Sequence, residues 1–558
     1  MSKSVHSVVI VGGSAAGLRC ACRLARLQPG WKITVVEKRE IFSVAGCGLP
    51  YVLSGEVADA EALRLTADGV RRDAQYFREM KGVEVLAGWL ASGVDAQAHK
   101  LRIARGGAEK VLDWDDLVLA TGARPQRLPG QPDHPRVRSL HSFDDLAPLT
   151  AGLRRGEIER VIVVGASFVG CELAEAFAAL WGAEVRLFEA GLAPLADNVD
   201  LEVGAIAARA LEEGGVKVQT GAKVERVRAG ADDAAVIVGA ETHAAQLVMV
   251  AIGMEPVVEL ALRAGVALGP TRAISVDDRL ATSVPHIWAI GDCIQVPQGV
   301  SERPVYLPLG SHANRQGRTL ANILAGRADR FEPVVGVRAL KVFDCHVAAA
   351  GVTRRVAADR GLPVRSVWLA ARDRADYWPE AKELFLHLLY QPGTRRVVGV
   401  QAAGQGDVTK RIDVAAQLLH YGATLEDFAR LEHAYAPPFA PALDPLAVAA
   451  HIALNQEDGI EALSPAHVTS KLDLLDVRRA AESAERPLGG PKVRQIPLGE
   501  LPGRTAELSG HEWLVVCERG ARSAEAVRRL AAAGIKARYL GGGLHWLRAA
   551  GWAERLAE

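Results

Sequence analysis

The amino-acid sequence repeats one local pattern, an apolar strand that runs into a glycine turn and then into an alanine-rich helix. The pattern first covers Val8–Gly17 and returns at Val161–Gly170. Both copies open with a run of consecutive apolar residues, which is typical of a strand buried on both faces in a parallel sheet. The repeat therefore predicts an α/β chain that contains two similar strand–helix–strand units.

Each copy continues to a second apolar strand that ends in an acidic residue. These strands are Ile33–Glu37 and Val185–Glu189. The acid follows the last glycine of the turn by about 20 residues, which is the spacing of the dinucleotide-binding fingerprint. In that fingerprint the helix N-terminus binds a pyrophosphate and the acid binds a ribose hydroxyl. The alternative, two ordinary turns between strand and helix, does not account for the acid in both copies.

The repeat assigns residues to two dinucleotide sites. Ser14 and Ser167 replace the middle glycine of the fingerprint, and both are small enough to let a backbone approach a phosphate. The residues of the first site are Gly12, Ser14, Ala15, Ala16, Gly17, Glu37 and Lys38, and those of the second are Gly165, Ser167, Gly170 and Glu189. FAD together with a nicotinamide nucleotide is the usual pair. Glu189 would repel a 2′-phosphate, so NADH is favoured over NADPH.

Three further apolar strands end in glycine motifs, which are Thr121-Gly122, Gly253 and Gly291-Asp292. With these motifs the sequence resembles the flavin-dependent pyridine nucleotide–disulfide oxidoreductases. The resemblance implies that FAD occupies the first site, with Asp292 on its ribityl chain. It also implies a split FAD-binding domain (1–148 and 272–330), an NAD(P)H-binding domain (149–271) and an α+β dimerisation domain (331–455) that forms a homodimer.

Cys47 is the predicted redox cysteine, and it lies in the string Gly46–Tyr51. Val52 stands where glutathione and lipoamide reductases carry a second cysteine, so Cys47 must use another sulfur partner or form a sulfenic acid. The string resembles the single-cysteine branch of coenzyme A–disulfide reductases, persulfide reductases, NADH oxidases and NADH peroxidases, although that branch commonly has Asn in place of Gly46. An inert buried cysteine is the alternative.

The resemblance to this branch implies further site residues. Tyr435 would reach the active cysteine of the partner subunit, and Tyr377 resembles a second active-site tyrosine; a phenol can protonate a leaving thiolate. Arg23, Arg26 and Ser43 are candidates for binding coenzyme A. The alternatives are packing for the tyrosines and a solvated helix face for the arginines.

Residues 465–558 are predicted to form an appended α/β domain, after a linker at 459–465. In this segment Cys517 ends the strand Trp513–Val516 and a short loop leads through Arg522 into a helix. Backbone N–H groups and the helix dipole at such a position favour a thiolate or a persulfide. The segment resembles a rhodanese (sulfurtransferase) domain, with Cys517 and Arg522 as its catalytic residues, and a binding module with an inert cysteine is the alternative.

These residues together predict an enzyme, an FAD-dependent oxidoreductase that uses NADH to reduce persulfides, polysulfides or coenzyme A disulfide at Cys47. Sulfur transfer is expected at Cys517. Two alternatives stay open: an NADH oxidase or peroxidase that cycles Cys47 through sulfenic acid, and a redox sensor or sulfur carrier with negligible turnover.

Composition narrows the list of partners. Lys plus Arg and Asp plus Glu both number 66, which argues against a nucleic-acid binder that relies on positive charge. No apolar run approaches the ~20 residues that span a bilayer, so no membrane partner is expected. The seven cysteines form no CxxC pair, which argues against a metal site and favours a reducing cytoplasm. The cysteines predicted to be bystanders are Cys20, Cys22, Cys171, Cys293 and Cys345.

Overall fold

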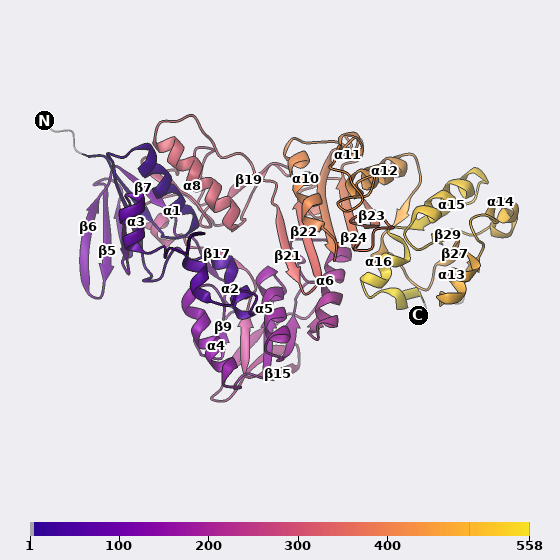
Figure 1. Cartoon of the computed structure of the whole chain (residues 1–558), viewed down its shortest axis with the longest axis horizontal. Helices are drawn as coiled ribbons and strands as arrows, with labels where there is room; N and C mark the ends of the chain where they lie inside the picture. Colours follow the sequence, from indigo (N-terminus) through magenta and orange to yellow (C-terminus); the bar gives the residue numbers. More distant parts are fainter. Residues whose placement is uncertain (1–4, 490–491, 557–558) are drawn as a thin grey trace. The chain divides into compact units, whose positions relative to one another are not determined.

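The structure, a computed structural model, describes residues 5–489 and 492–556. The chain is an α/β protein that divides into two compact units, coloured along the sequence in Figure 1. The first unit contains the residues up to Gly165 together with Ala176–Leu187 and Val224–Val334. The second contains Ala166–Glu175, Phe188–Lys223 and the residues from Val335 onward. The two units therefore cut across the predicted nucleotide-binding domains, whose boundaries stay a prediction.

The first copy of the repeat builds a parallel sheet at the core of the first unit. The strands are β1 (Ser7–Val11), β2 (Lys32–Glu37), β3 (Glu84–Ala87), β7 (Asp116–Leu119) and β18 (Ile287–Ala289), in the order β18-β7-β1-β2-β3. Val8 and Ile10 are completely buried, as are Leu117 and Val118 on the neighbouring strand. The continuous apolar runs in the sequence thus reflect strands that are covered on both faces.

Helices α1 (Ala15–Leu27) and α8 (Gly310–Leu324) pack side by side in this unit (Figure 1). Gly317 makes their close approach possible, because a Cβ at this position would overlap the Ala16 carbonyl oxygen and lie 3.0 Å from the Cβ of Arg19. The N-terminus of α1 follows the first glycine turn, and that of α8 lies beside Cys47. The contact between the two helices therefore joins two predicted functional segments.

The second copy of the repeat builds a second parallel sheet. Its strands in the first unit are β9 (Val137–Arg138), β10 (Arg160–Val164), β11 (Glu184–Phe188) and β16 (Leu247–Val250), in the order β11-β10-β16-β9. Helix α5 (Phe168–Ala179) follows β10.

Smaller elements complete the first unit. One antiparallel sheet consists of β4 (Leu90–Asp95), β5 (Lys100–Arg105) and β6 (Ala108–Asp113), and another consists of β13 (Arg226–Ala229), β14 (Ala234–Val238) and β15 (Glu241–Ala245). Two strand pairs are β8 (Ala123–Pro125) with β17 (Met254–Pro256) and β19 (Val296–Gln298) with β20 (Arg303–Val305). The helices are α2 (Leu49–Leu53), α3 (Ala74–Lys81), α4 (Leu146–Arg154) and α7 (Glu259–Arg263).

An antiparallel sheet covered by helices lies in the second unit. The strands, in the order β21-β22-β25-β24-β23, are β21 (Arg338–Val342), β22 (Cys345–Gly351), β23 (Arg365–Arg372), β24 (Glu383–Tyr390) and β25 (Val397–Gly404). The other elements of this part are β12 (Lys217–Gln219) and helices α6 (Leu201–Glu213), α9 (Arg354–Asp359), α10 (Val408–His420), α11 (Leu425–Ala429) and α12 (Pro445–Glu457). Helix α10 packs on β22 and β25, and α12 packs on β23 and β24.

The C-terminal residues form a separate parallel sheet with its own apolar core. The strands, in the order β26-β30-β29-β27-β28, are β26 (Ala462–Leu463), β27 (Asp473–Asp476), β28 (Val493–Gln495), β29 (Trp513–Val516) and β30 (Ala537–Leu540). The helices are α13 (Ala480–Glu485), α14 (Leu501–Arg504), α15 (Ala521–Ala532) and α16 (Gly543–Ala549) (Figure 1). Strand β26 lies in the predicted linker at 459–465, so this connection contributes an edge strand to the sheet.

Glu202, at the start of α6, attaches the C-terminal sheet to the rest of the second unit. Its carbonyl oxygen accepts a hydrogen bond from the Trp546 indole at 3.2 Å, and its carboxylate accepts one from the Ser464 hydroxyl. The Trp546 ring also packs edge-on against Phe385 of β24. All of these contacts involve buried side chains, so the C-terminal module is docked on the sheet by a packed and hydrogen-bonded surface.

Within residues 5–489 and 492–556, no helix has the length and apolar character needed to cross a membrane, and no group of His, Cys, Asp or Glu side chains is arranged to hold a metal ion.

Candidate functional site

The first glycine turn has the geometry of a nucleotide cradle. Gly12 has a φ of +122°, and a Cβ there would overlap the Ala120 carbonyl oxygen. A Cβ at Gly17 would overlap the Gly12 carbonyl oxygen. Ser14 is the N-cap residue of α1 and its side chain makes no capping bond to the helix. Only glycine fits the first and last positions, and the N–H groups of α1 face the space that a phosphate would occupy.

Glu37 ends β2 with its carboxylate held by backbone donors. Its Oε2 accepts a hydrogen bond from the Gly13 N–H at 2.7 Å, and its Oε1 accepts one from the Arg39 N–H at 2.9 Å. A carboxylate fixed in this way beside the glycine turn is placed to accept a hydrogen bond from a ribose hydroxyl. Lys38 is exposed next to it.

Asp292 follows β18, which is an edge strand of the same sheet. Partial burial raises the pKa of the Asp292 carboxyl to about 6. The preceding Gly291 has a φ of +80°, and its N–H donates to the Gln316 side chain at 2.6 Å. Thr121 and Gly122 lie at the end of β7, where the Thr121 hydroxyl donates to the Val257 carbonyl at 2.6 Å. The cradle, the ribose acceptor and this acid together fit FAD.

The second glycine turn repeats the first. Gly165 has a φ of +94°, and a Cβ there would lie 2.7 Å from the Ala251 carbonyl oxygen. The Glu189 carboxylate accepts hydrogen bonds from the Ala166 N–H at 2.7 Å and from the Gly191 N–H at 2.6 Å. This is the arrangement seen at Glu37, and it fits a nucleotide whose ribose carries free hydroxyls.

The remaining predicted residues of the second site are Ser167, Gly170 and Gly253. The Ser167 hydroxyl accepts a hydrogen bond from the Gly170 N–H at 3.3 Å. Gly253 has a φ of +116°, a conformation that favours glycine.

Cys47 is presented on an exposed turn. It lies in the short 3₁₀ helix η1 (Gly46–Gly48), just before α2, and its side chain is exposed. A Cβ at Gly310, the first residue of α8, would lie 3.9 Å from the Cys47 sulfur. The sulfur therefore lies beside the N-terminus of α8, the positive end of its dipole, a position of the kind found at reactive cysteines. The exposure argues against an inert buried cysteine.

Positive charge gathers on the face shared by α1 and α8. Desolvation lowers the pKa of the Arg23 guanidinium, and the neighbouring guanidinium groups of Arg318, Arg327, Arg26 and Arg19 lower it further. Arg23 also donates to the Asn322 side chain at 3.1 Å. Sequence reasoning found Arg23 and Arg26 but did not assign Arg19, which lies on the same helix. It also missed Arg318 and Arg327, which come beside α1 only in the fold.

Ser43 is buried, and its N–H donates to the Gly13 carbonyl at 3.1 Å. Its φ of +56° lies in the left-handed region, which a serine adopts only when its surroundings require it. This contact ties the cysteine-bearing loop to the first glycine turn.

The two predicted tyrosines belong to the second unit and are strongly exposed. Tyr377 is 73% exposed and Tyr435 is 53% exposed, and Phe439 and Leu443 near Tyr435 are also more than half exposed. Large apolar side chains in one region of surface are typical of a face that another molecule covers.

Cys517 lies in a narrow backbone loop between β29 and α15. The residue is 1% exposed, and its sulfur accepts a hydrogen bond from the Gly520 N–H at 3.2 Å. The N–H of Leu544, at the start of α16, donates to the Cys517 carbonyl at 3.0 Å. The loop is thus held on one side by α15 and on the other by α16.

Arg522 is oriented by an acid that sequence reasoning missed. Its guanidinium donates two hydrogen bonds to Glu482, at 2.6 and 3.1 Å. These bonds, together with a contact from Arg479, lower the pKa of Glu482 to about 2. Glu482 lies on α13, far from the cysteine motif in the sequence, so no local pattern could reveal it.

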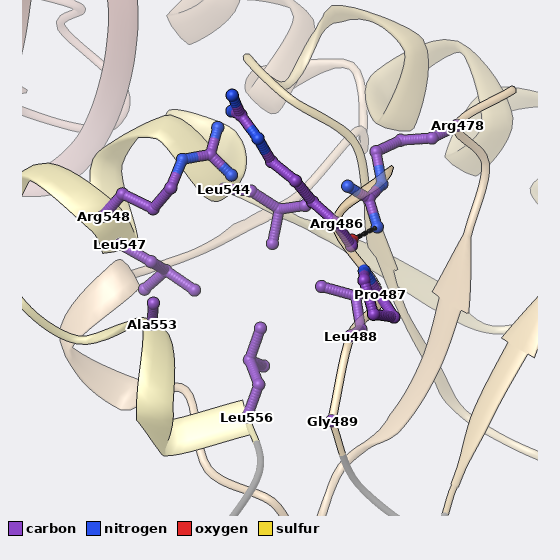
Figure 2. A pocket seen from close by; sticks show the side chains of 10 residues that line it. All are labelled: Arg478, Arg486, Pro487, Leu488, Gly489, Leu544, Leu547, Arg548, Ala553 and Leu556. Carbon is purple, nitrogen blue, oxygen red and sulfur yellow. Dashed lines mark hydrogen bonds between the residues drawn. The ribbon is translucent and has the colours of Figure 1, made fainter. Parts of the chain in front are cut away.

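A pocket of about 180 Å³ lies in the C-terminal module, lined by residues of α16, of the segment after α13 and of the C-terminal turn (Figure 2). Leu544, Leu547 and Leu556 form part of its apolar lining, and Arg478 and Arg548 also line it. Both guanidinium groups bind the Glu518 carboxylate. Hydrogen bonds from His545, Arg548 and Arg478 hold the pKa of Glu518 far below its usual range. The described lining contains no nucleophile, so the pocket offers no second candidate for sulfur chemistry.

The remaining cysteines differ from the exposed Cys47 in that burial raises the pKa of their thiols. It raises the pKa of the Cys20 thiol to about 12 and that of Cys345 to about 11, and it also raises the pKa of Cys22, Cys171 and Cys293. These thiols stay protonated at neutral pH and are poor nucleophiles.

Two glycine cradles, each with an acid for a ribose, define an oxidoreductase that binds two dinucleotides. The chain belongs to the pyridine nucleotide-disulphide oxidoreductase family. Residues 6–317 match this family, and residues 337–447 match its dimerisation domain. The family uses FAD and NAD(P)H, so the α/β class and the two expected cofactors are confirmed. The dimerisation domain supports the expected homodimer.

Curated relatives cover most of the chain. The NAD(P)H coenzyme A polysulfide/persulfide reductase of Pyrococcus horikoshii is 32% identical over 456 residues, which are 80% of this chain and 98% of the relative. An NADH oxidase of Methanocaldococcus jannaschii is 28% identical over 450 residues, again 80% of this chain and 98% of the relative.

One solved structure similar to the whole fold is an NAD-dependent persulfide reductase from A. fulgidus. It has a TM-score of 0.93 and 36% identity and covers 97% of this chain and 99% of its own. A CoADR-RHD protein from Bacillus anthracis has a TM-score of 0.92 and 28% identity, and it covers 100% of both chains.

Proposed function

We propose that this protein is an NADH-dependent flavoenzyme that reduces the sulfur–sulfur bond of persulfides, polysulfides or coenzyme A disulfide, and that its C-terminal module is a rhodanese-type sulfurtransferase. The observation that carries the proposal is the setting of Cys47. It is exposed, it faces the N-terminus of α8, and Val52 occupies the position of a second redox cysteine. The persulfide-reducing relatives from P. horikoshii and A. fulgidus support the same chemistry.

The proposed reaction consumes one NADH for each sulfur–sulfur bond. FAD, when bound, supplies a route for two electrons from NADH to sulfur. A persulfide RSSH then yields RSH and H₂S, with NADH and one proton becoming NAD⁺, and a disulfide RSSR yields two RSH. The part of Cys47 is to attack the sulfur–sulfur bond as a thiolate and hold one sulfur of the substrate as a mixed disulfide or persulfide.

The surrounding residues place the substrate and move protons. Arg23 and Arg26, with Arg19, Arg318 and Arg327, offer a cationic face for the phosphates of coenzyme A. The exposed phenol of Tyr435 is proposed to lie at the partner subunit's Cys47 and to protonate the leaving thiolate, with Tyr377 beside it. Glu189 makes NADH the preferred nucleotide because a 2′-phosphate would meet its carboxylate.

Sulfur transfer is proposed at Cys517. Its sulfur attacks the outer sulfur of a donor such as thiosulfate, becomes a persulfide, and releases sulfite. The Gly520 N–H and the α15 N-terminus stabilise the anionic sulfur. Arg522, oriented by Glu482, neutralises the donor anion. The persulfide then passes its outer sulfur to an acceptor thiol, which becomes a substrate for the reductase.

The test compares NADH oxidation with coenzyme A persulfide, polysulfide, coenzyme A disulfide and oxygen as acceptors. Rapid turnover of the sulfur acceptors is expected, and Cys47→Ser should abolish it. Cys345→Ser is the matched control, because this cysteine lies on β22 and belongs to neither proposed site. Rapid oxygen turnover without a response to sulfur would refute the proposal and favour the NADH oxidase alternative. Negligible turnover with every acceptor would favour a sensor or carrier.

A further inference from the structure

The loop that carries Cys517 touches the antiparallel sheet of the reductase through one ion pair. Arg519, the second residue after the cysteine, donates a hydrogen bond to Oε1 of Glu383 at 2.8 Å. Glu383 is the first residue of β24. Both side chains are about 30% exposed, with 29% for Arg519 and 31% for Glu383, so the pair is partly shielded from solvent.

Glu383 also faces the segment that carries Tyr377. The Nε of Arg372, at the end of β23, lies 3.6 Å from the same Oε1 of Glu383. Arg372 in turn donates from Nη1 to the carbonyl oxygen of Asp376 at 3.1 Å, directly before Tyr377. One carboxylate oxygen thus lies between the guanidinium of the Cys517 loop and the guanidinium that holds the Tyr377 segment.

Among the described residues, no second carboxylate contacts Arg519 or Arg372 at this position. His545 places its Nε2 3.7 Å from Oε1, and the other oxygen, Oε2, is buried without a hydrogen-bond partner among the same residues. Glu518, a nearby carboxylate in the same module, forms ion pairs with Arg478 and Arg548. Removing the charge of Glu383 therefore leaves Arg519 and Arg372 facing each other with no anion between them.

We propose that Glu383 is a positioning residue for both sulfur-handling segments of this chain: it holds the Cys517 loop through Arg519 and the Tyr377 segment through Arg372. The inference rests on the proposed function, because it assigns work to both segments. It adds that the two segments share one anchor. A sulfurtransferase loop that is held by the reductase sheet has its geometry set by the whole chain.

The test uses the full-length protein and four variants: Glu383→Gln, Arg519→Gln, Arg372→Gln and, as matched control, Glu380→Gln. Glu380 lies in the same connection between β23 and β24, where it is 76% exposed and pairs with Arg374 at 3.0 Å. Arg374 belongs to the same connection, so this ion pair is local and does not reach the C-terminal module. Glutamine keeps the size of glutamate, so a loss of fold is not expected, and FAD content checks it.

Hydrogen exchange gives a readout that does not depend on the function. In Glu383→Gln, peptides covering 517–522 should exchange about tenfold faster, since the hydrogen bond from Arg519 to a charged group contributes roughly that factor. Peptides covering 373–380 should also exchange faster, by a smaller factor, because Arg372 loses an ion-pair partner at 3.6 Å. Arg519→Gln should speed only 517–522, and Arg372→Gln only 373–380. Glu380→Gln should leave exchange at 517–522 as in the wild type, because its ion pair with Arg374 lies within the connection between β23 and β24. Wild-type exchange at either segment in Glu383→Gln would overturn the inference, as would a change of both segments in Arg519→Gln.

Activity gives the second readout. Glu383→Gln should lower kcat about tenfold for both thiosulfate sulfurtransfer and persulfide reduction, with the KM for NADH unchanged. Arg519→Gln should lower only the first of these activities, and the double variant Glu383→Gln/Arg519→Gln should transfer sulfur no more slowly than the worse single variant. A wild-type chain without either activity would refute the proposed function, and the exchange data would still decide the role of Glu383.

Discussion

Substitution of Gly317 by alanine tests how the fold positions both the first nucleotide site and Cys47. The new Cβ would overlap the Ala16 carbonyl oxygen and lie 3.0 Å from the Cβ of Arg19 and 3.1 Å from the backbone nitrogen of Cys20, whereas ordinary contacts begin at 3.4 Å. The neighbours are mostly backbone atoms of α1, which cannot turn aside. Helix α8 must therefore move away from α1.

Overpacking of this kind typically costs about 1–3 kcal/mol. A loss of about 1 kcal/mol lowers the melting temperature by roughly 2–4 °C in a domain of this size, so Gly317→Ala should lose between about 2 and 12 °C. The shift of α8 also moves Gly310 away from Cys47, and the shift at the start of α1 weakens the FAD cradle. We therefore expect faster release of FAD as well.

The assay is thermal unfolding followed by tryptophan fluorescence, with FAD release followed by flavin fluorescence. Gly30→Ala is the matched control, because Gly30 follows α1 and a Cβ there would meet no atom within 4 Å. Equal melting temperatures and equal FAD release for Gly317→Ala and Gly30→Ala would refute the packing argument.

Three further substitutions test single residues. Asp292→Asn removes a carboxyl whose pKa burial raises from an ordinary value of 3.8 to about 6, so ionisation of this group disfavours the folded apoprotein as pH rises through that interval. The variant should therefore be more stable than the wild type above pH 6 and equally stable below pH 3.8. Denaturation of the apoprotein at several pH values measures this, and a gain that does not change with pH would contradict it. Glu189→Ala removes the acceptor of two backbone N–H groups and the repulsion of a 2′-phosphate, so kcat/KM should fall about tenfold for NADH and rise for NADPH. If steady-state assays show an unchanged ratio of kcat/KM for NADH to kcat/KM for NADPH, Glu189 does not select the nucleotide. Tyr435→Phe should lower kcat for persulfide reduction about 100-fold, which is the usual minimum for the loss of a general acid. Tyr421→Phe is the control, because Tyr421 is also exposed. Equal kcat values for the two variants would exclude Tyr435 from the mechanism.

Local features were predictable from the sequence because their physical requirements are local. A glycine with positive φ at Gly12 and Gly165 follows from the strand–turn–helix pattern, and so does the acid at the end of the next strand. The Cys517 loop also follows from a strand end next to a helix start. In each case a few neighbouring residues determine the backbone, and the structure has the expected conformation.

Contacts between distant segments were not predictable in this way. Nothing near Arg522 in the sequence indicates that Glu482 binds it, and nothing near Arg519 points to Glu383. The edge strand β26 lies in a stretch with the composition of a linker, and only its pairing with β30 makes it a strand. Such contacts depend on which surfaces come together in the fold, and this information is spread over the whole chain.

The two cysteines proposed to handle sulfur have opposite surroundings, which limits how sulfur could pass between them. Cys47 is exposed on a turn, whereas Cys517 is 1% exposed and is enclosed by the backbone of its own loop and by α16. Thiol–disulfide exchange requires the attacking thiolate to reach a sulfur atom directly. A protein thiol on a broad surface cannot enter the Cys517 loop, but a small anion or the outer sulfur of a persulfide can. Under the proposed function, sulfur exchange between the two sites would therefore use a small carrier thiol, which fits a reductase proposed to act on small persulfides.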